Sequence, residues 1–371
     1  MVRLLKRFVR CESPTDSKPA MDHFGRMVAA EWRKRGAKIE YLPRKKEGNH
    51  LRVTWPANPA RRVGISARAG QILVLGHLDT VYSLGTIKKM PFRVRRGRAF
   101  GPGVFDMKGG IVNALFAVDA LAHAGWLPRR RIVFLWTSDE ETGSKSSRGV
   151  IQQEARRSAA VLVLEPAGGP DGQLKTRRKA TGTAELVITG RAAHAGLDPG
   201  AGVNAVHELA LQAARLMRLN NPRRGITVNP TIAQGGTRSN VIPAEARLTI
   251  DLRAETVGDM RGIERKLKTL RPILPGARVT VEGGFSRPPL ERRASAALFS
   301  QASKLAEQLG FSVGECLAGG GSDGNFTAAL GVPTLDGLGA VGEGPHSPDE
   351  QVIIAALPQR AALLAALLVT L

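Results

Sequence analysis

Histidine and carboxylate side chains follow several short apolar segments of this sequence, and one more histidine lies in a late loop. In chain order they are His77, Asp79, Asp106, Glu140, Glu141, Glu165 and His346. Two histidines and several carboxylates, with no cysteine near them, form a ligand set suited to zinc or a similar divalent ion. Each residue alone has an ordinary structural explanation, such as a hydrogen-bonded pair, a turn or a solvated loop. It is the combination that predicts a metal site.

The spacing inside two of these motifs predicts a division of roles. His77 and Asp79 lie two residues apart at the end of a strand-like segment, so their side chains share one face. Asp79 can then accept the second N–H of the imidazole and fix its tautomer. Glu140 and Glu141 are adjacent and cannot both point the same way from an extended chain. One can bind metal while the other reaches the attacking water.

The elements that must position these residues are typical of an α/β fold. Apolar runs at 71–77, 131–137 and 159–165 end in polar residues, as buried strands do. A segment with helical apolar spacing, 109–125, lies between the first two. We therefore expect a mixed, mostly parallel central sheet with helices on both faces, and an active site beyond the carboxyl ends of its strands.

The pattern changes near Thr176. Over 176–287 the order is strand, helix, strand, strand, helix, strand, which is typical of a small open sheet with both helices on one face. A long helix at 294–309 and a terminal helix at 361–371 return to the first domain. We predict a catalytic domain of residues 1–175 and 288–371, and an inserted α+β domain of residues 176–287. The length of 371 residues also favours two domains.

Composition excludes several classes of protein. Hydrophobic residues at 43% and charged residues at 23% argue against a fibre or a disordered chain. The two cysteines, Cys11 and Cys316, make no disulfide framework.

The basic segment 1–16 lacks the apolar stretch of a secretion signal and reads as an amphipathic helix. No apolar run approaches the ~20 residues of a membrane span. We expect a cytoplasmic enzyme without a membrane partner, or a periplasmic one if a leader precedes this sequence.

The net charge of +22, from 54 lysines and arginines against 32 acidic residues, raises the question of a polyanionic partner. The basic residues are spread along the whole chain, and aromatic residues make up only 5%. Both features argue against specific nucleic-acid recognition. A polyanion-binding role beside catalysis stays open.

Several motifs resemble, in order, those of one enzyme family. They are GHLDTVY (76–82), PGVFDMKGG (102–110), TSDEETGS (137–144), LEP (164–166) and PHSPDE (345–350), with GRAAHAG (190–196), SNVIP (239–243) and DLR (251–253) in the inserted domain. The resemblance is to the di-zinc metallopeptidases that include glutamate carboxypeptidases, acetylornithine deacetylases and succinyl-diaminopimelate desuccinylases. The TVY sequence and AGGGSDGNFTAALG (318–331) favour the glutamate carboxypeptidase branch.

The resemblance implies two zinc ions, and cobalt or manganese can use the same ligands. Asp106 would bridge the two ions. One zinc would also bind His77 and Glu165, and the other would bind Glu141 and His346.

The resemblance also assigns the remaining residues of the catalytic domain. Glu140 would be the general base, and Asp79 would orient His77. A cis peptide bond is expected between Asp106 and Met107. Met107 stands where the family often has an acidic residue, which removes one charge near the metals and leaves their ligation intact.

In the inserted domain the resemblance implies substrate contacts and pairing of two subunits. His194 would donate to the developing oxyanion, and Arg253 with Asn240 would hold the free carboxylate of the substrate. Arg287 and the backbone amides of Gly319–Gly321, centred on Gly320, are further candidates. A homodimer is expected, in which His194 reaches the partner's site.

We therefore expect zinc-dependent hydrolysis of an amide bond beside a free carboxylate. The reaction would release a C-terminal amino acid, with glutamate expected, from peptides or N-acyl (folate-like) conjugates. An N-deacylase acting on acetylornithine or succinyl-diaminopimelate is the alternative, because the same zinc ions would serve it. A non-catalytic binding protein is disfavoured, since every expected ligand and the base are present.

Overall fold

A six-stranded sheet lies at the centre of the larger of two units in the computed structural model, which describes residues 1–55 and 70–371. Its order is β1 (Lys38–Leu42), β2 (His50–Trp55), β6 (Ile132–Thr137), β3 (Gln71–His77), β7 (Ser158–Val163) and β16 (Thr334–Leu335). The last four run parallel, whereas β1 and β2 are antiparallel to their neighbours. The predicted mixed, mostly parallel sheet is confirmed.

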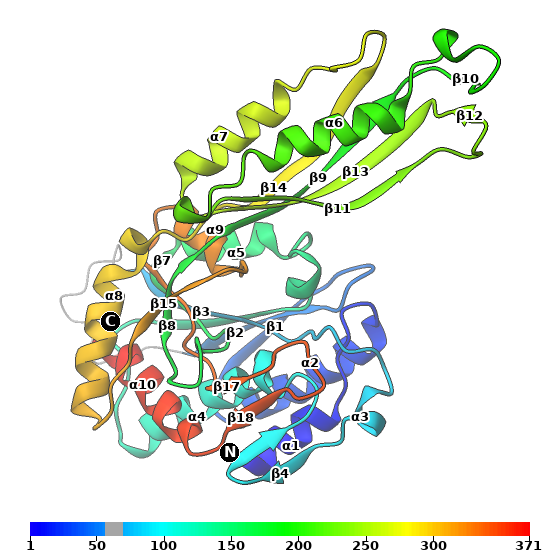
Figure 1. The fold of residues 1–371 in the computed structure, drawn as a ribbon. Helices are drawn as coiled ribbons and strands as arrows, with labels where there is room; N and C mark the ends of the chain where they lie inside the picture. Colours follow the sequence, from blue (N-terminus) through cyan, green and yellow to red (C-terminus); the bar gives the residue numbers. More distant parts are fainter. Residues whose placement is uncertain (56–69) are drawn as a thin grey trace. The chain divides into compact units, whose positions relative to one another are not determined.

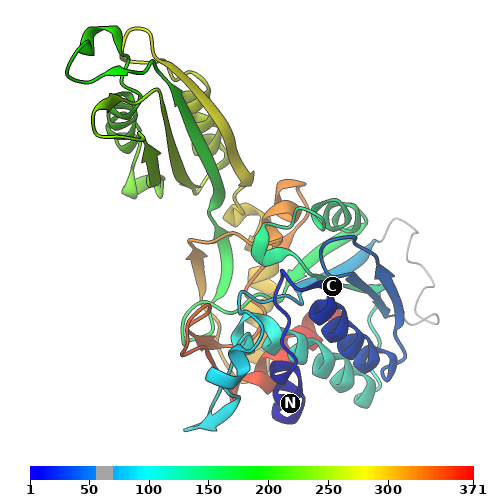
Figure 2. The same ribbon diagram turned by 90° about the vertical axis from the view of Figure 1, so that its right-hand side faces the viewer.

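Both faces of this sheet are covered, and its central strands β3 and β6 are buried at every position. Along β3, Ile72 and Val74 face one core, while Leu73 and Leu75 face the other. The first core contains side chains of five helices, namely α1 (Val2–Arg10), α2 (Lys18–Arg33), α4 (Gly109–His123), α8 (Arg292–Gln308) and α10 (Ala356–Thr370). The second contains those of α5 (Arg148–Arg156) and α9 (Gly324–Ala329). Figures 1 and 2 show the helices of the two groups on opposite sides of the sheet.

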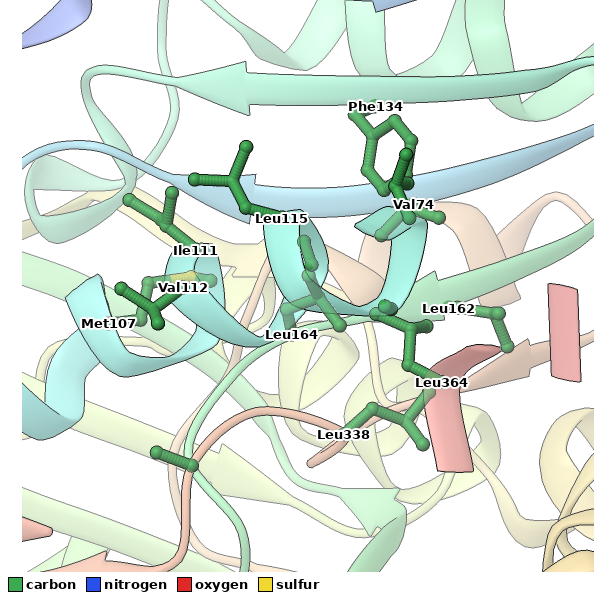
Figure 3. Close-up of a cluster of buried hydrophobic side chains, with 14 of the residues drawn as sticks. Val74, Met107, Ile111, Val112, Leu115, Phe134, Leu162, Leu164, Leu338 and Leu364 are labelled. Carbon is green, nitrogen blue, oxygen red and sulfur yellow. The ribbon is translucent and has the colours of Figure 1, made fainter. Parts of the chain in front are cut away.

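The first core joins three strands to two helices in one apolar cluster. Figure 3 shows Val74, Phe134 and Leu162 from the strands, Ile111 and Leu115 from α4, and Leu364 from α10. All six are fully buried. Burying one such side chain contributes roughly 1.5–3 kcal/mol. This packing fixes the strands, and therefore fixes the loops at their carboxyl ends.

The remaining elements of the larger unit are short. A small antiparallel sheet has the order β17 (Gly342–Glu343), β18 (Gln351–Ile353), β5 (Arg98–Phe100) and β4 (Arg93–Arg95). A pair is formed by β15 (Glu315–Ala318) and β8 (Leu174–Arg178), and α3 (Thr86–Lys89) is a single turn. Helix α1 buries Leu4, Leu5, Phe8 and Val9 and exposes its basic residues, as its amphipathic pattern predicts. Within the two described ranges, no helix is both long enough and apolar enough to cross a membrane.

The second unit comprises Arg178–Leu290 with Gly319–Gly321, and the larger unit comprises the rest of the described chain. Its antiparallel sheet has the order β11 (Thr227–Gly235), β13 (Glu245–Ala254), β9 (Ala180–Thr189) and β14 (Arg278–Arg287). Helices α6 (Ala205–Met217) and α7 (Val257–Lys268) pack against one face and share a single core with the sheet. A two-residue pair, β10 (Ala193–His194) with β12 (Val241–Ile242), completes the unit. The observed order of strands and helices is the one predicted from the sequence.

The chain enters and leaves the second unit at adjacent points. The Arg178 N–H donates to the Leu290 carbonyl at 2.9 Å, and the Leu290 N–H donates to the Arg178 carbonyl at 3.0 Å. The long segment of the second unit therefore begins and ends at neighbouring backbone positions, and the short loop Gly319–Gly321 is its only other part among the described residues.

Candidate metal centre

Three neighbouring parallel strands carry candidate ligands at their carboxyl ends. His77 is the last residue of β3 and pairs with Thr137, the last residue of β6. The turn Glu140–Thr142 follows β6, and Glu165 follows β7 by two residues. Parallel strands end at the same edge of a sheet, so these side chains meet there. Two further ligand candidates come from loops: Asp106 lies in the segment Val104–Lys108 before α4, and His346 lies between β17 and β18.

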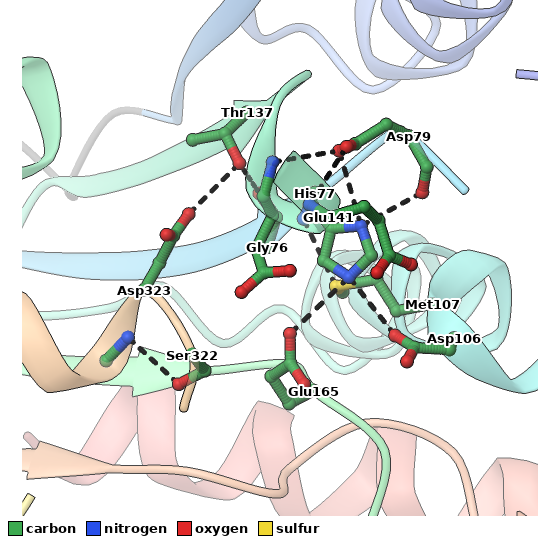
Figure 4. Close-up of polar contacts among 12 residues, drawn as sticks. Gly76, His77, Asp79, Asp106, Met107, Thr137, Glu141, Glu165, Ser322 and Asp323 are labelled. Carbon is green, nitrogen blue, oxygen red and sulfur yellow. Dashed lines mark hydrogen bonds and ion pairs between the residues drawn. The ribbon is translucent and has the colours of Figure 1, made fainter. Parts of the chain in front are cut away.

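The two histidines contact opposite oxygens of one carboxylate (Figure 4 shows the His77 side). His77 Nε2 is 3.1 Å from Asp106 Oδ1, and His346 Nε2 is 3.4 Å from Asp106 Oδ2. Each imidazole also has a glutamate neighbour: Glu165 Oε1 is 3.4 Å from His77 Nε2, and Glu141 Oε2 is 3.3 Å from His346 Nε2. Asp106 therefore lies between two similar pairs of candidate ligands, His77 with Glu165 and His346 with Glu141.

These distances fit a pair of bound metal ions. Ligand atoms around a tetrahedral zinc, with bonds of about 2.0–2.1 Å, lie about 3.3 Å apart. Donor atoms of His77, Glu140 and Glu165, and of His77, Asp106 and Glu141, also fall within 4.8 Å of one another. The set holds imidazoles and carboxylates, which suit zinc, cobalt and manganese.

The protein without metal places protons where the cations would bind. Burial opposes charge on His77, but hydrogen bonds to Asp106, Asp79 and Glu165 raise its pKa well above the usual value. Hydrogen bonds to Asp106 and Glu141 raise the pKa of His346 to about 10. Burial opposes ionisation of Asp106, yet its bonds to His346 and His77 keep its pKa low, with help from the positive charge of Lys175. Burial raises the pKa of Glu141. A cation must therefore displace imidazole protons to bind.

Asp79 positions the glutamate turn as well as His77. Its carboxylate accepts from the backbone N–H of Glu140 at 3.3 Å and of Glu141 at 3.1 Å, and from the Thr15 hydroxyl at 2.8 Å. The Nδ1 of His77 is 3.0 Å from the backbone carbonyl of Asp79 and 3.5 Å from its carboxylate. The backbone carbonyl thus makes the shorter contact, where the sequence indicated the side chain.

Glu140 and Glu141 diverge from one short helical turn. Glu140 belongs to the group with His77 and Glu165, and Glu141 to the group with His77 and Asp106. Asp139 directly precedes this turn and anchors it to the following loop. Its carboxylate accepts from the Ser146 N–H at 2.7 Å and from the Ser146 hydroxyl at 2.8 Å. His50, which matches no motif, is fully buried beside this turn, with Nε2 3.2 Å from the Ser146 hydroxyl.

The peptide bond between Asp106 and Met107 is cis, as the resemblance implies, and the Met107 sulfur accepts from the His77 N–H at 3.1 Å. Two further residues that contact the candidate ligand segments were given no role from the sequence. Glu350 accepts from backbone amides at Asp106, and Tyr82 contacts the loop that carries His346. Tyr82 is the last residue of GHLDTVY, and Glu350 is the last residue of PHSPDE. Their position inside these motifs is the sequence signal that could have identified them.

The candidate residues for substrate contacts lie in the second unit. His194 ends β10 and is exposed, and its Nδ1 accepts from the backbone N–H of Gly196 at 3.2 Å and of Leu197 at 3.1 Å. These bonds leave the proton on Nε2, where it can be donated. The backbone carbonyl of Asn240 accepts from Ala195 N at 2.9 Å, so Asn240 lies beside the His194 segment. Arg253 projects from β13 and contacts Asp251.

Arg287 and the glycine loop also lie together in the second unit. A Cβ atom added to Gly321 would be 3.0 Å from Arg287 Cδ, so the loop approaches this arginine closely. Arg178 Nη1 donates to the carbonyls of Gly320 and Gly321, each at 3.3 Å. The carbonyls of this loop therefore have an internal partner in Arg178.

Comparison with known proteins places this geometry in a family. The model of peptidase family M20/M25/M40 matches residues 73–370. The chain belongs to this family. The M20 chain is 35% identical to carboxypeptidase G2 of Pseudomonas sp. (strain RS-16) over 315 residues, or 83% of this chain and 75% of that protein. It is 26% identical to succinyl-diaminopimelate desuccinylase of Dechloromonas aromatica (strain RCB) over 383 residues, or 98% of this chain and 96% of that protein.

Solved structures share the M20 fold. Aminopeptidase PepT from Bacillus cereus ATCC 10987 matches with a TM-score of 0.81 and 21% identity, covering 99% of this chain and 96% of that one. The YXEP protein of Bacillus subtilis, a dinuclear metal-binding peptidase of the M20 family, matches with a TM-score of 0.68 and 14% identity, covering 100% and 96%. The predicted resemblance and fold class are confirmed, and the chain is a hydrolase of the M20 metallopeptidase class.

Proposed function

We propose that this M20 hydrolase is a di-zinc metallocarboxypeptidase that releases a C-terminal amino acid, with glutamate preferred, from peptides or N-acyl conjugates. The observation that carries the proposal is the contact of His77 and His346 with opposite oxygens of Asp106. A single metal ion would not need this symmetry, whereas two ions sharing a bridging carboxylate would.

Glu140 is proposed as the group that moves the proton. Bound metal ions would polarise the scissile carbonyl and lower the pKa of the attacking water. Glu140, only 8% exposed, lies beside His77 and Glu165 and can take a proton from that water. It then delivers the proton to the leaving nitrogen, which departs poorly as an unprotonated amide anion. Asp79 keeps Glu140 in place through the backbone N–H.

His194 is proposed as the donor to the oxyanion. Its Nδ1 is engaged by two backbone amides, so Nε2–H is the donor. Strand β11 forms an edge of the second unit's sheet, and most of its residues, including Ile232 at 55% exposure, face solvent. This edge supports a homodimer in which His194 serves the partner's site.

The basic side chains of the second unit support an anionic substrate. Arg253 presents a planar fork suited to a carboxylate, and Arg287 would take a second one. Asn240 and the amides around Gly320 are proposed to add hydrogen bonds. A dianionic residue such as glutamate matches two cationic groups, and the net charge of +22 attracts it at long range.

An N-deacylase of the succinyl-diaminopimelate type is the second candidate. Its support is the desuccinylase relative, which aligns over 98% of this chain. The same residues would hold the metals, and only the substrate pocket would differ.

Ranking kcat/KM over a panel of N-acylated amino acids tests the proposal. We expect N-acyl-glutamate, including aminobenzoyl-glutamate, to be cleaved at least about a hundredfold faster than the glutamine analogue, because a neutral amide would leave one guanidinium without its charged partner. Equal or faster cleavage of acetylornithine or succinyl-diaminopimelate would move the protein to the deacylase reading.

A further inference from the structure

Glu350 lies fully buried between the two loops that bring Asp106 and His346 together. We infer that Glu350 is a positioning residue that sets the geometry of the metal site containing His346. The inference rests on the proposed two-metal centre, and it adds a residue to which no role is otherwise given.

The Glu350 carboxylate binds three backbone amides of the segment that carries Asp106. Oε1 accepts from the N–H of Phe105 at 2.8 Å and of Asp106 at 2.8 Å, and Oε2 accepts from the N–H of Gly103 at 2.9 Å. Burial raises the pKa of this carboxyl to about 7, and the three amide hydrogen bonds favour its ionised form. These three bonds fall within residues 103–106, so they fix the backbone position from which the Asp106 side chain extends.

The other side of Glu350 is tied to the loop of His346. The backbone N–H of Glu350 donates to the Ser347 carbonyl at 3.2 Å, and the Ser347 N–H donates to the Gly344 carbonyl at 3.2 Å. The Tyr82 hydroxyl donates to the same Ser347 carbonyl at 2.9 Å, and it shares this single proton with the nearby Glu350 carboxylate. The turn therefore holds His346, whose φ is +62°, through its neighbour Ser347.

Of the two imidazoles, His346 depends more on this support. The His77 side chain is 1% exposed, and its Nδ1 is held by Asp79. The His346 side chain is 50% exposed. Nε2 of His346 must still stay 3.4 Å from Asp106 Oδ2 and 3.3 Å from Glu141 Oε2. Glu350 joins the two segments that set the first of these distances.

Glutamine at this position cannot replace the carboxylate. It offers one acceptor oxygen, and its amide nitrogen would face an N–H donor. Aspartate keeps both oxygens but is shorter by one methylene. Glu350→Gln should therefore loosen the Asp106 segment more than Glu350→Asp does. Tyr82→Phe keeps the three amide bonds to Glu350 and removes the contact with Ser347, so it should act mainly on the His346 loop.

The test is a titration of metal-depleted full-length protein with Co²⁺, followed by visible absorption, with kcat and KM measured at saturating metal. We assign the first equivalent to the site of the buried His77 and the second to the site of the half-exposed His346. For Glu350→Gln we expect the second equivalent to bind at least about tenfold more weakly, the first to change less than about threefold, and the d–d spectrum of the second to change. We expect kcat to fall and KM to stay within about threefold. Glu350→Asp should restore part of the affinity, and Tyr82→Phe should weaken the second equivalent by a smaller factor.

Glu154→Gln is the matched control. Glu154 is a buried carboxylate of the same unit, 2% exposed, that accepts from Gln71 Nε2 at 2.7 Å and pairs with Arg52. It should lower the melting temperature of the metal-free protein without changing either cobalt affinity or the spectrum.

Two results would overturn the inference. One is that Glu350→Gln lowers the melting temperature like the control while both cobalt affinities and the spectrum stay at wild-type values. The other is that both equivalents weaken equally. If Glu350→Gln does not fold, an unchanged second affinity in Tyr82→Phe overturns it instead. Failure of the proposed function looks different, because wild-type protein would then bind only one equivalent or cleave no N-acyl amino acid.

Discussion

The Arg253 guanidinium lies side-on against the Asp251 carboxylate, with Nε 2.9 Å from Oδ1 and Nη2 2.8 Å from Oδ2. The two residues are two positions apart on β13, so they share a face of the strand. Asp251 occupies one edge of the guanidinium and holds its plane. The edge formed by Nη1 and Nη2 is then oriented for a second carboxylate.

This pairing predicts how two substitutions change KM. Arg253→Lys loses the bidentate fork, and a charge-assisted hydrogen bond is worth about 1.5–3 kcal/mol, so KM for an N-acyl-glutamate should rise by roughly 10–100-fold. Asp251→Asn keeps one acceptor but loses the charge, and KM should rise several-fold. Steady-state kinetics measure both. An unchanged KM in Arg253→Lys would remove Arg253 from substrate binding.

Substitutions of the adjacent glutamates should separate proton transfer from metal binding. Glu140→Gln should keep both metal ions and lower kcat by several orders of magnitude, because it removes only the proton carrier. Glu141→Gln should lower metal content to nearly one ion per chain. Metal analysis beside kinetics distinguishes the two, and identical metal content in both variants would contradict this division of roles.

Metal affinity should rise with pH. The pKa of His346 is about 10 and that of His77 lies well above its usual value in the protein without metal, so each binding event at neutral pH releases a proton. Affinity should therefore strengthen by about tenfold per pH unit for each proton released. Calorimetry in buffers of different ionisation enthalpy counts these protons, and heats that are independent of the buffer would refute the prediction.

The same histidines should affect the stability of the metal-depleted protein in the opposite direction. A raised pKa in the folded state contributes stability that is complete below the unfolded value of 6.5. That contribution is lost as pH rises through the folded value. Melting curves should thus show the metal-depleted protein losing stability between about pH 6.5 and pH 10, and a constant difference between loaded and depleted protein would argue against it.

Subunit mixing tests the role of His194. Inactive His194→Ala and inactive Glu140→Gln chains should regain activity when mixed and allowed to exchange, because one site of the mixed dimer would be complete. Each variant alone provides the control. A fully active monomer in light scattering would contradict both the dimer and the action of His194 across it.

The sequence was sufficient to predict the strands and the gathering of the candidate ligands at one site, because both leave local patterns. Apolar runs ending in His77 or before Glu140 mark strands whose ends meet, since parallel strands share an edge. The larger sheet and the order of elements in the inserted domain could be predicted for the same reason.

Contacts between side chains and distant backbone could not be predicted in this way. Glu350 binds the amide of Phe105 across 245 positions, and a carboxylate that accepts from backbone N–H groups imposes no residue type on its partner. The Asp79 carboxylate likewise binds the amides of Glu140 and Glu141, 61 and 62 positions away. From the sequence, only the two-residue spacing between Asp79 and His77 was visible. That spacing suggested the His77 imidazole as the partner of the Asp79 carboxylate.

The paired main-chain bonds between Arg178 and Leu290 make the second unit exchangeable. A tight turn grafted between these two positions would close the larger unit without stretching its chain, and a foreign domain with adjacent termini could be spliced in at the same point. Such an exchange would leave unchanged the strand ends that carry the candidate metal ligands. Chimaeras that carry the corresponding segment of a relative with different substrates are a direct route to altered selectivity on this scaffold.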